Sequence, residues 1–239
     1  MTISEDTSNQ PVPVHSTTTT ATTASFTPQA GTLLVAMLAV DGSALTATTG
    51  ILTDSTTGTW TLLARSNAHT NPSLGGSSEV WCQYLAAAPG AMTVIGTWTA
   101  TGQAAGNLTV RSLLGAAAVQ TGATGTNGGA SVAPAATLTP TQLGSWVYGA
   151  CLDYATNASL TANANTTLID QFQDSGNGDT WATFKAKVAT ASLSSTAFGF
   201  TNANNAFNTA AAEILAATVS ASVAPSLIVG QAVGRAATW

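Results

Sequence analysis

Charged side chains are scarce in this sequence. Asp, Glu, Lys and Arg make up 6% of the 239 residues, whereas a typical globular domain contains about 25%. Only five residues are Lys or Arg, and the formal net charge is −5. Nucleic acids and anionic membrane surfaces are bound by clustered cations, so we expect neither partner. A nearly neutral surface of Thr, Ser, Asn, Gln, Ala and Gly suits a protein that packs into a larger assembly.

The sequence also lacks a long apolar run and a targeting segment. The uninterrupted apolar run at residues 33–40 contains eight residues, whereas a membrane-spanning helix needs about 20. The first residues, MTISEDTSNQ, have neither the basic region nor the apolar region of a signal peptide. We therefore expect no membrane insertion and no signal peptide.

Cysteine is limited to Cys82 and Cys151, which both lie inside apolar runs. This placement predicts buried free thiols, with a disulfide between them as the alternative. No C-x-x-C spacing is present, so the cysteines do not indicate a metal site.

Short apolar runs dominate what is present. They contain β-branched and aromatic residues, and Gly, Asn, Pro and Asp separate them. In EVWCQYL, for example, the alternate residues Val80, Cys82 and Tyr84 would share one face of a strand, and the residues between them would share the other. By propensity alone the alanine-rich AAAEILAA around Glu213 is a helix candidate. Many short strands predict an all-β sandwich or barrel.

Five segments recur in the same order along the chain. The pairs are GTLLVAMLAVD with GSWVYGACLD, GTWTLLARS with NTTLIDQF, EVWCQYLA with DTWATFKA, TVIGTW with AFGFTN, and NLTVRSLLGA with NTAAAEILAA. We interpret them as a pseudo-repeat of two five-strand halves, residues 31–116 and 144–217; the alternative is the loose likeness of any two strand-rich segments. The pattern predicts a jelly-roll-like β-sandwich of about ten strands over residues 22–217, and it makes AAAEILAA a strand.

Three segments lie outside the two halves. Residues 1–21 are rich in Thr and predict an extended arm or an extra strand. Residues 120–140 are rich in Gly and predict a loop that links the halves. Residues 218–239 form an apolar tail that we expect to dock on the sandwich or on a neighbour; its expected assembly contacts are Leu227, Ile228, Val229 and Trp239.

The sequence shows no catalytic constellation and no cofactor motif. His15 and His69 are expected in surface or loop positions, because no nucleophile elbow accompanies them. Asp41 and Asp153 each follow an apolar run and could form the carboxylate pair of a glycosidase, but strand-end turn residues are the interpretation we favour. Glu79 is expected to face solvent at the start of a strand.

Two weaker binding signals remain. Asp174, Asn177 and Asp179 lie in a Gly-containing acidic stretch and could offer oxygen ligands to Ca²⁺, although the spacing does not match an EF-hand. Asp179 also begins a Trp-containing strand, so a solvent-facing position is its alternative. Six tryptophans suggest a glycan site, and Trp98 in GTWTATGQ is the one we expect to be exposed.

The succession FTPQAGTLLV, GTWTLLARS, SEVWCQYLAAAPGAMTV, LTVRSLLGA, LTPTQLGSWVYGA and AAEIL resembles virion proteins of bacteriophages that infect high-GC Gram-positive bacteria. Such proteins are described as minor tail, tail-fibre-like or decoration proteins, and the resemblance covers roughly residues 20–217. It implies a non-enzymatic structural protein on the tail or capsid exterior, made in the host cytoplasm. Its partners would be other virion proteins and copies of itself, with no catalytic residue and no cofactor.

A carbohydrate-binding adhesin for the host envelope is the alternative function. It would use an exposed aromatic face such as that of Trp98, and its partner would be a cell-envelope glycan.

Overall fold

The computed structural model describes residues 1–42, 50–67, 75–99, 105–154, 157–188, 193–202 and 205–218. Every helix or strand assigned in these ranges is a β-strand, which confirms the predicted all-β class. None of the described residues belongs to a helix that could cross a membrane.

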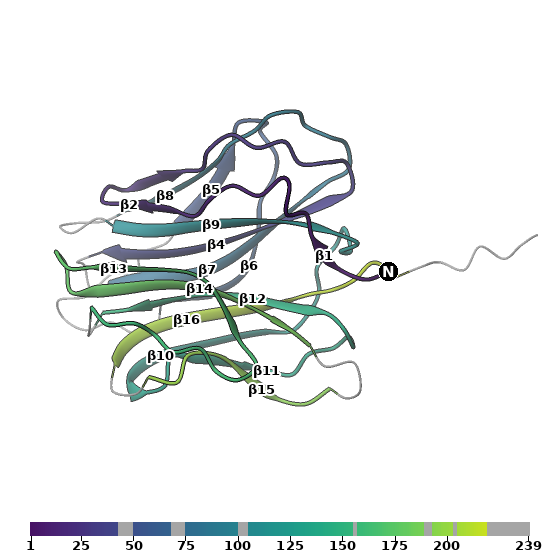
Figure 1. Cartoon of the computed structure of the whole chain (residues 1–239). Coiled ribbons are helices and arrows are strands. Elements are labelled where there is room, and N and C mark those ends of the chain that lie inside the picture. Colours follow the sequence, from purple (N-terminus) through teal and green to yellow (C-terminus); the bar gives the residue numbers. More distant parts are fainter. Residues whose placement is uncertain are drawn as a thin grey trace, which may run out of the picture.

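Two inner sheets pack face to face as a β-sandwich, and a smaller outer sheet covers the far face of each (Figure 1). The first inner sheet contains β1 (Ser4–Glu5), β2 (Val14–Ser16), β4 (Thr32–Gly42), β6 (Thr61–Ser66), β7 (Gly75–Leu85) and β9 (Ala105–Leu114). The second contains β10 (Thr124–Val132), β12 (Trp146–Asp153), β13 (Thr167–Asp174), β14 (Asp179–Lys187) and β16 (Asn205–Ile214).

The outer sheets are shorter. One consists of β3 (Thr20–Thr22), β5 (Gly50–Asp54) and β8 (Val94–Trp98), and the other of β11 (Ala135–Leu138) and β15 (Thr196–Gly199). All pairings between strands are antiparallel. The body therefore has four layers and three apolar cores between them.

Strand β4 explains the apolar run at residues 33–40. Successive side chains of a strand point to opposite faces, and here both faces meet a core. One set, Leu33, Val35, Met37 and Ala39, packs between the two inner sheets. The other, Leu34, Ala36, Leu38 and Val40, packs against the outer sheet of β3, β5 and β8. All eleven residues of β4 are buried, which accounts for the absence of polar alternation.

The two inner sheets share one strand order. In the first, the order is β9-β4-β7-β6, and in the second it is β16-β12-β14-β13. These strands carry four of the five segments that recur in the sequence, taken in the same sequence order, and the fifth pair falls in β8 and β15 of the outer sheets. The shared order agrees with two related halves, while the internal repeat and the jelly-roll connectivity stay predictions. AAAEILAA belongs largely to β16, so the choice of strand over helix is confirmed.

The segment at residues 120–140 is not a linking loop, as its glycines had suggested. It forms β10, which pairs with β16, and β11, which pairs with β15. Glycine is tolerated in β10 because the strand lies at a sheet edge, where Gly125 approaches the carbonyl oxygen of Thr137 too closely for a larger residue.

The N-terminal residues also belong to the sheets. Strands β1 and β2 pair with β9, and β3 pairs with β8. Glu5 of β1 reaches across to the second inner sheet, where its carboxylate accepts a hydrogen bond from Tyr148 Oη at 3.0 Å and pairs with Lys185 Nζ at 2.5 Å. This segment, expected to be an arm or an extra strand, therefore supplies three strands and ties the two sheets together.

Gly149 lies at the centre of β12, where a Cβ atom would stand 2.6 Å from the carbonyl oxygen of Ala210 and 2.2 Å from Phe184 Cζ. We expect Gly149→Ala to lower the free energy of unfolding by about 1–3 kcal/mol because the backbone of β16 cannot move away. Gly129→Ala in β10 is the matched control, since its Cβ would meet nothing closer than 4.0 Å. Urea denaturation measures both, and equal effects would contradict the close packing of β12 on β16.

Candidate functional site

Most of the ten carboxylates accept hydrogen bonds or form ion pairs within the fold. Six examples are Glu5, Asp6, Asp54, Glu79, Asp170 and Glu213. Glu79, predicted to face solvent, is instead fully buried and ion-paired with Arg65 Nε at 2.8 Å. That prediction was wrong because Glu79 stands inside β7, opposite Leu38, and not at a strand start.

Glu213 of β16 shows how such a carboxylate organises the chain around it. Its oxygens accept hydrogen bonds from three backbone N–H groups and two hydroxyls, which belong to Ala123, Thr141, Gln142 and Ser145. Burial acts to raise the pKa of Glu213, but these hydrogen bonds outweigh it and hold the pKa below its usual value. The carboxylate therefore fixes two segments of the chain, the one just before β10 and the one just before β12.

The other four carboxylates, those of Asp41, Asp153, Asp174 and Asp179, gather at one end of the two inner sheets. They stand at the end of β4, the end of β12, the end of β13 and the start of β14. The carboxyl groups of Asp41 and Asp179 lie close enough to interact with each other across the interface between the sheets. The sequence had suggested Asp41 with Asp153 as the convergent pair, and it had suggested a solvent-facing Asp179.

Burial argues against a hydrolytic role for these carboxyls. Asp41 is 2% exposed, Asp179 is 1% exposed and Asp153 is fully buried. A glycosidase needs both of its carboxyl groups at the sugar, one on each side of the scissile bond. A polysaccharide could not reach this pair in the folded protein. The interpretation of Asp41 and Asp153 as strand-end residues fits their positions, although both are buried and not part of an exposed turn.

The calcium candidates do not form one cluster of ligands. Asp179 points inward to Asp41, whereas Asp174 Oδ1 accepts a hydrogen bond from the N–H of Gly176 in the β13–β14 turn. Asn177 is half-buried in that turn. Among the residues that the structure describes, no three His, Cys, Asp or Glu side chains are arranged to hold a metal ion.

Trp98 is not the exposed tryptophan that the sequence suggested. It is 4% exposed and packs in the core beneath the outer sheet of β3, β5 and β8. The run GTWTATGQ looked like an exposed edge, but Trp98 ends β8, whose alternate residues face that core. A buried indole offers no face for a sugar ring.

His15 makes a contact that no sequence pattern signalled. Its Nε2 lies 2.8 Å from Asp170 Oδ2, and its ring stacks on Phe172 with 4.4 Å between centroids. Both partners belong to β13 of the second inner sheet, so His15 joins the halves near their edge. His69 and the four expected assembly contacts, Leu227, Ile228, Val229 and Trp239, lie outside the described residues.

Both cysteines are free and buried, as predicted. Burial raises the pKa of the Cys82 thiol to about 11 and raises that of Cys151 as well. Thiols that stay protonated at neutral pH are poor nucleophiles and poor metal ligands.

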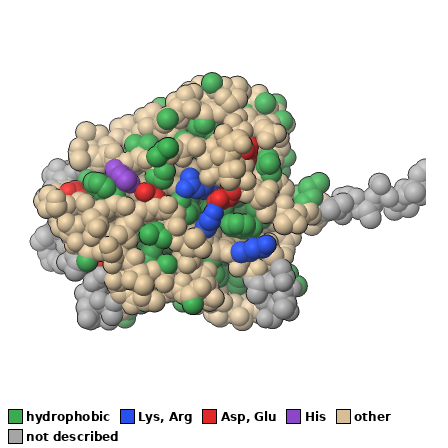
Figure 2. Space-filling view, viewed as in Figure 1, with side chains coloured by type: hydrophobic (Ala, Val, Ile, Leu, Met, Phe, Trp, Pro, Cys, Tyr) green, Lys and Arg blue, Asp and Glu red, His purple; other side chains and the backbone are tan. Residues whose placement is uncertain are grey.

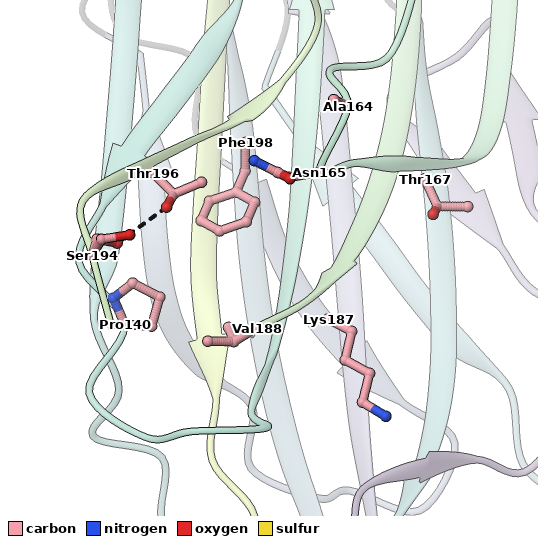
Figure 3. Close-up of a pocket in the computed structure, with 9 residues that line it drawn as sticks. All are labelled: Pro140, Ala164, Asn165, Thr167, Lys187, Val188, Ser194, Thr196 and Phe198. Atoms are coloured by element: carbon pink, nitrogen blue, oxygen red, sulfur yellow. Dashed lines mark hydrogen bonds between the residues drawn. The ribbon is translucent and has the colours of Figure 1, made fainter. Parts of the chain in front are cut away.

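A pocket of about 490 Å³ opens beside β15 and the start of β13 (Figure 3). Its lining consists of Pro140, Ala164, Asn165, Thr167, Lys187, Val188, Ser194, Thr196 and Phe198. Among the described residues of this lining, hydroxyl, amide and apolar groups accompany one cation, and none is a carboxylate or a histidine. The pocket can bind a small polar molecule, but its lining offers no acid–base pair for catalysis.

The surface has the low charge that the composition predicts. On the face shown in Figure 2, charged side chains are few, and most of them lie near the middle.

Comparisons with protein-family models, with curated protein sequences and with solved structures found no match. The function must therefore be argued from the residues themselves.

We expect Glu213→Gln to lower the free energy of unfolding by about 2–3 kcal/mol at neutral pH, because an amide cannot accept all of the hydrogen bonds of the carboxylate. The native pKa is depressed, so this stabilisation is present above the unfolded pKa of about 4.3 and is lost as the pH falls through the native value. Denaturation of both proteins between pH 3 and pH 7 measures the difference. A difference that stays constant over this range would contradict a role for the ionised carboxylate.

Proposed function

We propose that this chain is a non-enzymatic structural protein of a bacteriophage virion, mounted on the tail or on the capsid surface. The resemblance of residues 20–217 to such virion proteins is the starting point. The layered all-β body and the low surface charge support it, because a rigid and nearly neutral module packs against neighbours with little desolvation of charge. Most carboxylates also form hydrogen bonds or ion pairs within the fold, which suits a protein whose acids stabilise its structure.

One end of the body carries the observation on which the proposal rests. The exposed apolar side chains of Met1, Val119 and Leu143 stand near the backbone of residues 215–217; we call them the apolar end. They are 70%, 73% and 48% exposed. The hydrogen bonds that place them run from Met1 N to Ala217 O, between Gln120 and Leu215, and between Gln142 and Ala216.

The apolar end suits attachment to another protein. Single exposed apolar residues are normal, but several near one point mark a contact surface. The last residues that the structure describes, up to residue 218, also lie at this end. A neighbouring subunit that covers this end would bury the three side chains. We infer that the subunit is held in the virion at this end.

The double variant Val119→Asp/Leu143→Asp tests the attachment. We expect it to fold with a melting temperature within about 2 °C of the wild type, since exposed substitutions change stability little. We also expect its incorporation into particles to fall at least tenfold, because two charges would have to be desolvated in the contact. Quantitative mass spectrometry of purified particles measures incorporation.

Ile51→Asp is the matched control, because Ile51 is 59% exposed on β5 in an outer sheet. It should leave incorporation unchanged. Equal incorporation of all three proteins would contradict attachment at the apolar end. Immunogold labelling of intact particles tests the function itself: label on the tail or on the capsid surface is expected, and purified particles that lack the chain would overturn the proposal.

Glycan binding is a second candidate, and the pocket beside β15 is the observation that favours it. Its amide and hydroxyl groups, shown in Figure 3, match the hydrogen-bonding groups of a saccharide. If the chain is an adhesin, Asn165→Ala should abolish binding on an array of cell-envelope glycans, and Trp98→Phe should leave it intact. The opposite pattern would exclude the pocket, and an array without any signal would exclude this second function.

A further inference from the structure

Two carboxyl groups from different sheets meet inside the body. Asp41 is the second-last residue of β4, and Asp179 is the first of β14. Neither forms an ion pair with any residue that the structure describes. Asp41 Oδ1 and both carboxyl oxygens of Asp179 are buried with no donor among the described groups when both residues are ionised. A buried carboxylate without a donor is costly, so something must compensate this pair.

Among the residues that the structure describes, the groups around the pair do not supply a positive charge. Asp174 faces it from β13, Asp153 from β12, and the phenol of Tyr154 follows β12. Cys151 of β12 stands beside Tyr154. Strand β16 contributes the neutral amide of Asn208, which donates from Nδ2 to Tyr154 Oη at 2.7 Å, and β7 contributes Gly76.

We propose that Asp41 and Asp179 share one proton and so form a pH-dependent clasp between the two inner sheets. With one carboxyl protonated, its hydroxyl donates to the carboxylate of the other, and the pair carries one negative charge in place of two. Two adjacent carboxylates in a buried position hold such a proton because the doubly ionised state is strongly disfavoured.

The electrostatics of the site agree with the shared proton. Burial first, and then the neighbouring Asp41, raise the pKa of Asp179 to about 9, and burial also raises the pKa of Asp41. The unfolded value of an aspartate is about 3.9. A raised native pKa gives stability that is complete below about pH 4 and declines as the pH rises through about 9. Acid therefore tightens this clasp and alkali loosens it.

The location of the clasp decides what its opening would do. Strands β4 and β14 are interior strands of their sheets, and the core between the sheets continues directly beneath the pair. Loss of the shared proton places two like charges across the interface at one end. We expect the sheets to separate first at this end, while the Glu5 bridge to Tyr148 and Lys185 holds them elsewhere.

Asp179→Asn tests the clasp, since its amide can donate permanently to Asp41. We expect the melting temperatures of wild type and variant to agree at pH 4.5 and to diverge as the pH rises, with the variant about 5–10 °C higher at pH 9. Asp41→Asn should behave in the same way. Agreement between the two variants would show that the effect comes from the pair and not from a local change at one substituted position. Hydrogen exchange at pH 9 should be faster in wild-type β4 and β14 than in the variants.

Asp54→Asn is the control with the opposite sign. Asp54 is buried, but hydrogen bonds from Thr56, Gly58 and Trp60 keep its pKa low, so this variant should be less stable than wild type at neutral pH and converge with it in acid. Lower melting temperatures of Asp179→Asn and Asp41→Asn at pH 8 would overturn the clasp. So would a rise of the wild-type melting temperature in calcium chloride that Asp179→Asn abolishes, because a cation would then occupy the place of the proton.

Discussion

The double-sided burial of β4 is the constraint on which the rest of the fold depends. A strand with apolar side chains on both faces needs a core on each, and a simple two-sheet sandwich gives an inner sheet only one. The outer sheet of β3, β5 and β8 supplies the second core, and β11 with β15 does the same for the other inner sheet. Each large side chain fully buried in this way contributes about 1.5–3 kcal/mol. The four layers follow from this requirement.

Three apolar cores leave few places for charge, which explains how the ten carboxylates are used. Glu213 and Asp54 gather backbone N–H donors of adjacent loops, whereas Glu5 and Asp170 each bind side chains of the opposite inner sheet. Each such group trades hydration for several short hydrogen bonds, which stabilise an ionised carboxylate at neutral pH. The fold therefore depends on acids as local connectors, and a protein with so few charges cannot also devote them to a charged surface.

The sequence predicted the parts of the fold that follow from local pattern. Alternation in EVWCQYL indicated β7, and the comparison of AAAEILAA with NLTVRSLLGA correctly outweighed the helix propensity of alanine. The glycines of residues 120–140 misled, because glycine marks both loops and edge strands that approach another backbone closely, as Gly125 does. The predicted number of strands, about ten, was too low for a different reason. Short edge strands such as β1, β2 and β11 carry little sequence pattern of their own.

Side-chain environments were predicted less well, and the reason is three-dimensional. Whether Trp98 or Glu79 faces solvent depends on a second layer of strands that the single-strand pattern cannot reveal. The contact between Asp41 and Asp179 joins residues 138 positions apart (179 − 41) at ends of strands in different sheets, so no spacing rule could have indicated it. Yet both residues were notable in the sequence as acids that border apolar runs. An acid in that position either leaves the body at a turn or enters it with a partner, and the layer packing decides which of the two occurs.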